Sequence, residues 1–165
     1  MARLLVVHHS PTPTARAVAE AAIAGAGDDA LDGVEVVVRE ALSATAADVL
    51  AADGYLLGTT ANFGYMSGAL KHFFDTIFLE AGGALTGDGS AGPTGGGAAG
   101  GRKPYGLWVH GRYDTTGAVR SVQSIVQALG WQQSASVLEI LGDVGETEHA
   151  AAYELGGTIA ALLSE

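Results

Sequence analysis

The sequence predicts an α/β fold in which helices cover both faces of a parallel β-sheet. Short apolar or β-branched runs, typical of buried strands, alternate five times with segments of helical composition. Each parallel crossover requires a helix, and right-handed connections distribute those helices over the sheet. The 165 residues are most simply one domain, spanning 1–165, with a sizeable core.

The five expected strands are apolar runs bounded by glycine, proline or polar residues. They are Arg3–His8, Val34–Val38, Gly54–Gly58, Tyr105–His110 and Ala135–Leu141. The expected helices lie between and after them, at Ala15–Gly27, Ser43–Asp53, a segment ending near Leu79, Ala118–Gly130 and Thr147–Leu163. In the third helix, apolar residues recur at helical spacing and are expected to face the core: Met66, Leu70, Phe73, Phe74 and Ile77.

One stretch has the composition of neither helix nor strand. Residues 82–103 are rich in glycine, which weakens both kinds of element. We expect this stretch to be a mobile excursion within the single domain.

Composition and charge exclude several classes of function. The formal net charge of −10 repels nucleic acid and anionic lipid, so we expect neither as a partner. The chain has no cysteine, which excludes disulfides, thiolate metal sites and cysteine nucleophiles. The start, MARLLVVHHS, is too short in its apolar run for a signal peptide, so we expect a cytoplasmic protein.

Three loops are the expected location of function, because ligands of such sheets bind beyond the carboxyl ends of the strands. They are HSPTPT, TTANFGYMS and HGRYDTT, which follow the first, third and fourth strands. The first places the hydroxyls of Ser10, Thr12 and Thr14 before a helix, whose N-terminus attracts anions. A phosphate monoester would fit there; plain N-capping of the helix explains the same residues equally well.

The other two loops offer aromatic side chains. Phe63 and Tyr65 flank Gly64, which permits close backbone approach to a flat ligand. Packing on a neighbouring loop or on a second subunit is the alternative. Tyr113 belongs to the third loop, which either lines the opposite side of the same ligand or only caps the next helix. We expect no metal site, because His8 and His9 are adjacent on a strand and point to opposite faces.

A family resemblance adds to this interpretation. The stretch GTTANFGYMSGALKHFFD, Gly58–Asp75, resembles the G-T-P-x-x-F-G-N/x-M-S-G-x-x-K-x-F-x-D pattern of one branch of the flavodoxin-like FMN-binding superfamily. That branch comprises NAD(P)H:quinone oxidoreductases and multimeric flavodoxin reductases. The SPTPTA loop is similar to the family's S-x-T-G-N-T phosphate loop, with Pro13 in place of the glycine and Thr14 in place of the asparagine.

The resemblance implies a five-stranded parallel sheet of order 2-1-3-4-5 and three groups of FMN contacts. The residues implied at the phosphate are Ser10, Thr12, Pro13 and Thr14; those at the flavin ring are Thr60, Ala61, Asn62, Phe63, Gly64 and Tyr65; those on its other side are His110, Gly111 and Tyr113. No catalytic side chain is implied, since the flavin carries the chemistry.

The implied function is an FMN-dependent oxidoreductase. It would pass a hydride or electrons from NAD(P)H through FMN to a quinone or another small acceptor, and it would act as a homo-oligomer. A flavodoxin-type electron carrier, which meets a protein partner and turns over no pyridine nucleotide, is the first alternative. A protein of this fold that binds no flavin is the second, because the phosphate loop departs from the family pattern.

Overall fold

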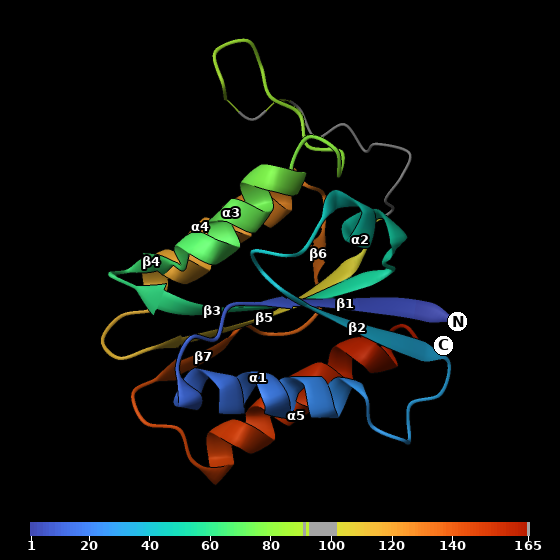
Figure 1. Cartoon of the computed structure of the whole chain (residues 1–165), viewed down its shortest axis with the longest axis vertical. Helices are drawn as coiled ribbons and strands as arrows, with labels where there is room; N and C mark the ends of the chain where they lie inside the picture. The colour runs from blue at the N-terminus through green and yellow to red at the C-terminus, as the bar shows by residue number, and fades with distance from the viewer. Residues whose placement is uncertain (91, 93–101, 165) are drawn as a thin grey trace.

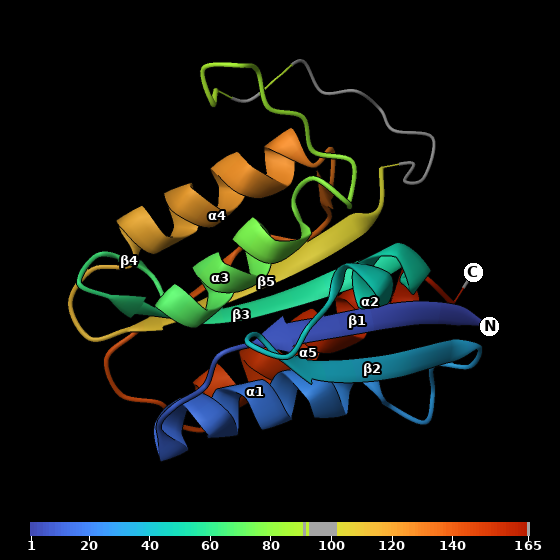
Figure 2. The same ribbon diagram turned by 45° about the horizontal axis from the view of Figure 1, so that its top comes forward.

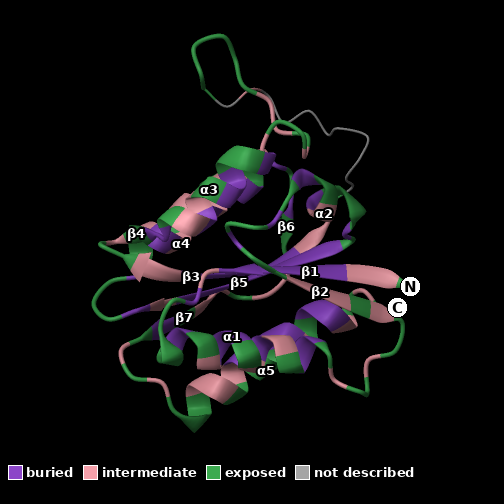
Figure 3. Ribbon diagram, viewed as in Figure 1, coloured by how far each residue is buried: buried purple, intermediate pink, exposed green. Residues whose placement is uncertain are grey.

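The computed structural model describes residues 1–90, 92 and 102–164. Its centre is a parallel sheet in which the four longest strands run in the order β2-β1-β3-β5. These strands are β1 (Ala2–His8), β2 (Val34–Glu40), β3 (Gly54–Asn62) and β5 (Pro104–Gly111). β1, β3 and β5 are buried along most of their length, because helices cover both of their faces (Figure 3).

The predicted parallel sheet with helices on both faces is confirmed, and its strand order differs from the prediction in two details. The single fifth strand expected at Ala135–Leu141 is two short strands, β6 (Gln132–Gln133) and β7 (Leu138–Leu141), which both pair with the outer edge of β5. β6 and the following Ser134 form a polar run, QQS, with no apolar side chain to bury, and within the described residues β6 pairs only with the start of β5. In addition, β4 (Tyr65–Met66) pairs antiparallel with the end of β3.

Among the described residues, five helices form the outer layers (Figure 1). Two lie on one face, α1 (Pro13–Ala26) and α5 (Glu146–Ala161); three lie on the other, α2 (Ala46–Ala51), α3 (Gly68–Ile77) and α4 (Thr116–Ala128). Alternate residues of β1 serve the two layers: Leu4 and Val6 belong to the core beneath α1 and α5, while Leu5 and Val7 belong to the opposite core.

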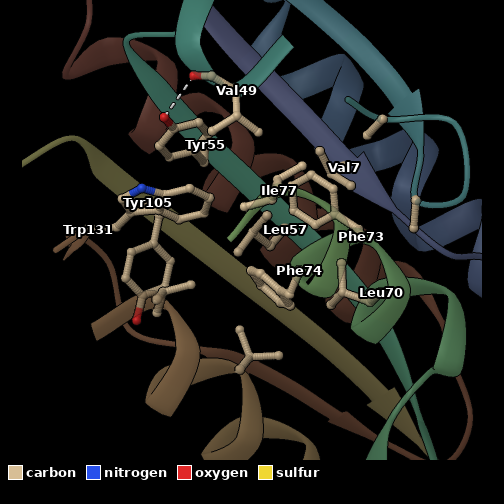
Figure 4. Packing of buried hydrophobic residues seen from close by; sticks show 14 of the residues in the cluster. Val7, Val49, Tyr55, Leu57, Leu70, Phe73, Phe74, Ile77, Tyr105 and Trp131 are labelled. Atoms are coloured by element: carbon tan, nitrogen blue, oxygen red, sulfur yellow. Dashed lines mark hydrogen bonds between the residues drawn. The ribbon is translucent and has the colours of Figure 1, made fainter. Parts of the chain in front are cut away.

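The core beneath α2, α3 and α4 is aromatic. The predicted apolar stripe of α3 is confirmed for Leu70, Phe73, Phe74 and Ile77, which are all fully buried against the sheet (Figure 4). Met66, which the prediction also placed in this helix, is buried but lies in β4, before the helix begins. The rings of Tyr55 and Trp131 stack with centroids 3.8 Å apart. The Tyr55 hydroxyl donates a hydrogen bond of 2.9 Å to the carbonyl oxygen of Val49, so its one polar atom is satisfied in the core.

The helices begin at one edge of the sheet, where the parallel strands end. β1, β3 and β5 point their carboxyl ends to the same side, and the N-termini of α1, α3 and α4 follow directly (Figure 2). This arrangement gathers the loops that carry the expected site.

The glycine-rich stretch lies only partly within the described residues. In residues 82–90 the chain forms no helix, and Thr86 closes a turn by accepting at its carbonyl from Gly89 N and donating its N–H to Ser90 O. The remainder of the predicted mobile excursion of 82–103, at positions 91 and 93–101, lies outside the described residues. Within the described part, no helix is both long and apolar enough to cross a membrane.

Candidate functional site

The three predicted loops meet at the carboxyl edge of the sheet. His9, the first residue after β1, donates its N–H to the carbonyl oxygen of Gly58 in β3 at 3.0 Å. On the other side of β3, Thr60 is the register partner of His110 near the end of β5. The loops after β1, β3 and β5 are therefore neighbours, although they are far apart in the sequence (Figure 1).

The first loop leads into α1 through a side-chain cap. Thr12 is the N-cap, and its Oγ1 accepts a hydrogen bond of 3.1 Å from the N–H of Ala15. Pro13 occupies the first helical position, where its fixed φ suits the helix and its missing N–H leaves no donor unpaired. Thr12, Pro13 and Thr14 are exposed, whereas Ser10 is buried. Thr12 therefore caps α1, and the buried Ser10 takes no part in the cap.

The electrostatics of this loop suit an anion. The first turn of α1 contains no acidic residue, and the helix N-terminus carries a partial positive charge. Thr14 keeps a backbone N–H that has no acceptor within the helix. The guanidinium of Arg16 donates to the carbonyl oxygen of Pro11 at 3.4 Å, which holds a cation at the same loop.

Ser10 pairs with His8, a buried histidine that the sequence analysis considered only as a metal ligand. The Nδ1 atom of His8 lies 2.9 Å from the Ser10 Oγ atom. The His8 ring leans on Trp108, with ring centroids 6.2 Å apart. Burial lowers the pKa of His8 below its ordinary value; the carboxylate of Glu40 raises it and His9 lowers it further.

The second loop is a tight β-hairpin rather than a strand-to-helix turn. Asn62 in β3 pairs with Tyr65 in β4, and Phe63 and Gly64 form the two-residue turn between them. Both turn residues have positive φ, 52° for Phe63 and 77° for Gly64, as a primed hairpin turn requires. Glycine adopts this conformation freely, but an aromatic residue there is strained. The side chain of Phe63 is nevertheless fully exposed, at 108%.

Polar side chains brace the base of this hairpin. Thr60 Oγ1 donates to Asn62 Oδ1 at 2.8 Å, and Thr59 Oγ1 accepts from the N–H of Ser67 at 3.0 Å. Ala61 and Thr60 are half-buried, and Asn62 is exposed beside them. The tip therefore projects from a fixed base, and Phe63 is presented outward.

The third loop combines a structural histidine with an exposed aromatic. His110 donates its Nε2–H to the carbonyl oxygen of Gly142 at 2.8 Å, so the ring is engaged in holding two loops together. A Cβ atom on Gly111 would lie 3.0 Å from the Cβ of Ala61, which shows how closely this loop approaches the second one. Tyr113 is 90% exposed.

The start of α4 is organised by two acidic side chains. Asp114 accepts a hydrogen bond of 2.9 Å from the N–H of Thr116, and this bond lowers the pKa of its carboxyl group. Thr115 is the N-cap residue, but its buried hydroxyl donates to Glu139 on β7 instead of capping the helix. The third loop is thereby tied to the neighbouring strand.

Sequence reasoning missed these cross-loop contacts. Besides Thr115 and Glu139, the exposed pair of Arg112 and Asp143 joins the loops after β5 and β7 at 2.9 Å. The one signal in the sequence was an acidic residue, Glu139, inside the apolar strand LEIL, where it is exposed and free to reach a neighbouring loop. The arrangement as a whole places the hydroxyl-bearing start of α1 at the same edge of the sheet as three exposed aromatics, Phe63, Tyr65 and Tyr113.

Comparisons with known proteins bear on the fold. No family model matches the chain. A flavodoxin from Aquifex aeolicus (strain VF5) is 34% identical over 87 residues, a stretch that spans 53% of this chain and 46% of that relative. Among solved structures, a flavodoxin from the domain Archaea superposes with a TM-score of 0.76 at 17% identity, covering 99% of both chains.

A further solved structure is the flavodoxin, WrbA-like protein from Agrobacterium tumefaciens. It superposes with a TM-score of 0.72 at 17% identity and covers 99% of this chain and 98% of its own. The chain therefore has a flavodoxin-like fold and a flavodoxin homologue, and it matches that homologue over less than half of the homologue's length.

Proposed function

We propose that this protein binds FMN across its three loops and works as an FMN-dependent oxidoreductase. The observation that carries the proposal is Phe63, a strained aromatic residue with its whole side chain in solvent. Backbone strain at an exposed hairpin tip persists where function requires the side chain to stand there. A flat ring stacked on Phe63 would remove its apolar face from water.

The donors of the first loop fit a phosphate group. Pro11 and Pro13 remove two backbone N–H groups, but the hydroxyls of Ser10, Thr12 and Thr14 add three O–H donors at the same helix N-terminus. Each hydroxyl can donate to a phosphate oxygen, and the helix dipole favours the negative charge. No carboxylate in the first turn of α1 opposes it.

Each loop has a distinct task in the proposed complex. The first would hold the phosphate, and the hairpin from Thr60 to Tyr65 would cover the ring system with Phe63 and offer backbone groups along its rim. Gly111, His110 and Tyr113 would bound the other side. When bound, FMN supplies the capacity to accept a hydride or single electrons and to release them to an acceptor. The aromatic side chains would exclude water from it.

The proposed donor is NAD(P)H and the proposed acceptor is a quinone or a similar small molecule. The support is the resemblance of Gly58–Asp75 to the quinone oxidoreductase branch, which covers the end of β3, the hairpin turn with β4 and most of α3. A flavodoxin-type carrier is the second candidate. The Aquifex aeolicus flavodoxin and the net charge of −10, which suits a basic protein partner, favour it.

One set of measurements separates the two candidates. The purified protein is reconstituted with FMN, and oxidation of NADH and of NADPH is followed with and without a quinone. Quinone-dependent oxidation with saturable kinetics supports the reductase. Bound FMN with no oxidation of either nucleotide, together with electron exchange with a protein partner, supports the carrier.

A further inference from the structure

His8 is a buried titratable group to which the proposed FMN contacts give no task. It is 7% exposed at the end of β1, and its ring packs on Trp108 on the α1 and α5 side of the sheet. Its polar contact is with Ser10, through the 2.9 Å distance between Nδ1 and Oγ. Ser10 is also the one buried hydroxyl of the first loop.

The hydrogen-bond inventory of a serine limits what this pair can do. A hydroxyl has one O–H donor, and an imidazole nitrogen is either a donor or an acceptor. If Nδ1 of His8 lacks a proton, the Ser10 O–H points to His8 and only oxygen lone pairs remain for a ligand. If Nδ1 carries a proton, it donates to Oγ, and the Ser10 proton is free.

A phosphate dianion presents only acceptors, so it requires the second arrangement. We propose that His8 is the positioning residue of the phosphate site: its Nδ1–H, present in the neutral Nδ1–H tautomer and in the cation, donates to Ser10 Oγ and directs the Ser10 proton to the phosphate. The negative charge of the bound phosphate then draws a second proton onto the ring. This inference rests on the proposed function, because it takes the FMN phosphate as the ligand of the first loop.

The surroundings of His8 favour proton uptake on binding. Burial keeps its pKa below the ordinary value in the free protein, which favours the neutral ring there. The groups that act on it are Glu40 on β2, which favours the cation, and His9 on its own strand, which opposes it. Gly58 and Trp108 on the neighbouring strands are uncharged, and Arg16 on α1 is exposed. A phosphate next to Ser10 adds negative charge and raises the pKa of His8.

Linkage then fixes the direction of the pH dependence. A ligand that raises the pKa of a group binds with proton uptake, and its affinity falls as pH rises through the bound-state pKa. FMN affinity is therefore higher at low pH through His8. The phosphate's own ionisation near pH ~6 acts in the opposite direction and is common to all variants.

Two variants separate the donor from the charge. His8→Asn places an amide N–H where Nδ1 stands but cannot titrate; His8→Phe keeps a ring against Trp108 but has no donor. Dissociation constants for FMN and for riboflavin, which lacks the phosphate, are measured for each by fluorescence quenching. A hydrogen bond to a charged partner is worth about tenfold in affinity. We expect His8→Phe to lose FMN affinity by about this factor and riboflavin affinity not at all.

Calorimetry measures proton uptake on FMN binding, which would not differ between the variants if His8 had only a structural role. FMN is titrated into the wild type and His8→Asn at pH 7 in two buffers of different ionisation enthalpy, which reports the protons taken up. We expect uptake by the wild type in excess of His8→Asn, and none with riboflavin. Equal uptake in both proteins, or an equal loss of FMN and riboflavin affinity in His8→Phe, overturns the inference. Absence of FMN binding to the wild type defeats the proposed function itself.

Discussion

The carbonyl oxygen of Gly64 would lie 1.8 Å from a Cβ atom on Gly117, so the tip of the β3–β4 hairpin rests directly on the first turn of α4. Only a glycine at position 117 leaves room for this backbone contact. The hairpin that presents Phe63 is therefore positioned by a residue outside all three predicted loop contacts.

Replacing Gly117 with alanine should displace the hairpin tip. We expect Gly117→Ala to lower FMN affinity by at least about tenfold, because only a shift of the hairpin backbone can relieve the clash with the Gly64 carbonyl. Overpacking of this kind costs ~1–3 kcal/mol, which corresponds to that loss of affinity. Fluorescence titration with FMN measures this. Gly68→Ala is the matched control, because a Cβ there meets nothing within 4 Å. Equal affinities in the two variants would show that the contact does not position the site.

Replacing Phe63 with asparagine should raise the stability of the protein and weaken FMN binding. Asparagine followed by glycine is the preferred sequence of this turn type, so Phe63→Asn should raise the free energy of unfolding by about 1 kcal/mol. The same change removes the exposed ring and should weaken FMN binding about five- to tenfold. Urea unfolding of the apoprotein and FMN titration test the two signs separately.

Phe63→Tyr is the control for this pair of effects. It keeps both the ring and the strained backbone, so stability and FMN affinity should stay near those of the wild type. If Phe63→Asn binds FMN as tightly as the wild type, the exposed ring has no part in holding the cofactor.

A carboxylate at position 12 should repel the phosphate without harming the helix. Aspartate is as good an N-cap as threonine and suits the helix dipole, so Thr12→Asp should keep or raise thermal stability. Two like charges ~4 Å apart near a protein surface repel by several kcal/mol, which predicts a loss of FMN affinity of about 100-fold or more. Riboflavin affinity should be unchanged.

Thr12→Asn is the neutral counterpart, since it caps the helix without a charge. We expect it to bind FMN nearly as the wild type does. Unaltered FMN binding by Thr12→Asp would place the phosphate elsewhere.

Most of the fold follows from local signals in the sequence. The β-branched and apolar run at Val34–Val38 and the 3.6-residue stripe from Leu70 to Ile77 each match one kind of element. The valines of the run are half-buried in the structure, and the stripe is buried. Thr45 illustrates how far local chemistry reaches, because its capping box with Asp48 involves residues only three apart.

The rest depends on contacts between distant segments. The two-residue strand β4 exists because Phe63 adopts positive φ, which no propensity of phenylalanine predicts. The pairs of His8 with Ser10 and Thr115 with Glu139 need the folded register to bring them together. The sequence predicts the loops of the candidate site, but the pairs of side chains that brace these loops can be identified only from the structure.

Gly58 should be intolerant of any side chain. A Cβ atom there would lie 1.9 Å from Cζ2 of Trp108, whose ring is buried against β3. We expect Gly58→Ala to lower the free energy of unfolding by about 3 kcal/mol, measured by urea denaturation. Adding Trp108→Phe removes the clashing atoms, so the double variant should lose less than the sum of the single ones. Strict additivity would refute the clash.

The stability of the apoprotein should fall on acidification through His8. Because burial lowers its pKa in the folded state, the unfolded chain binds more protons between the folded and the ordinary pKa. The free energy of unfolding therefore rises with pH across that window. Below the window, the contribution of His8 stays at its lower value. His8→Asn should flatten this part of the profile in urea titrations; an unchanged slope would assign it to other groups.

The central claim is that one phosphorylated ring ligand spans the hydroxyl-rich start of α1 and the aromatic hairpin. Isothermal titration of the apoprotein with FMN tests it most directly. We predict one site per chain, tighter binding than for riboflavin, and quenching of flavin fluorescence. Neither heat nor quenching at saturating FMN, or equal affinity for the two flavins, would contradict it.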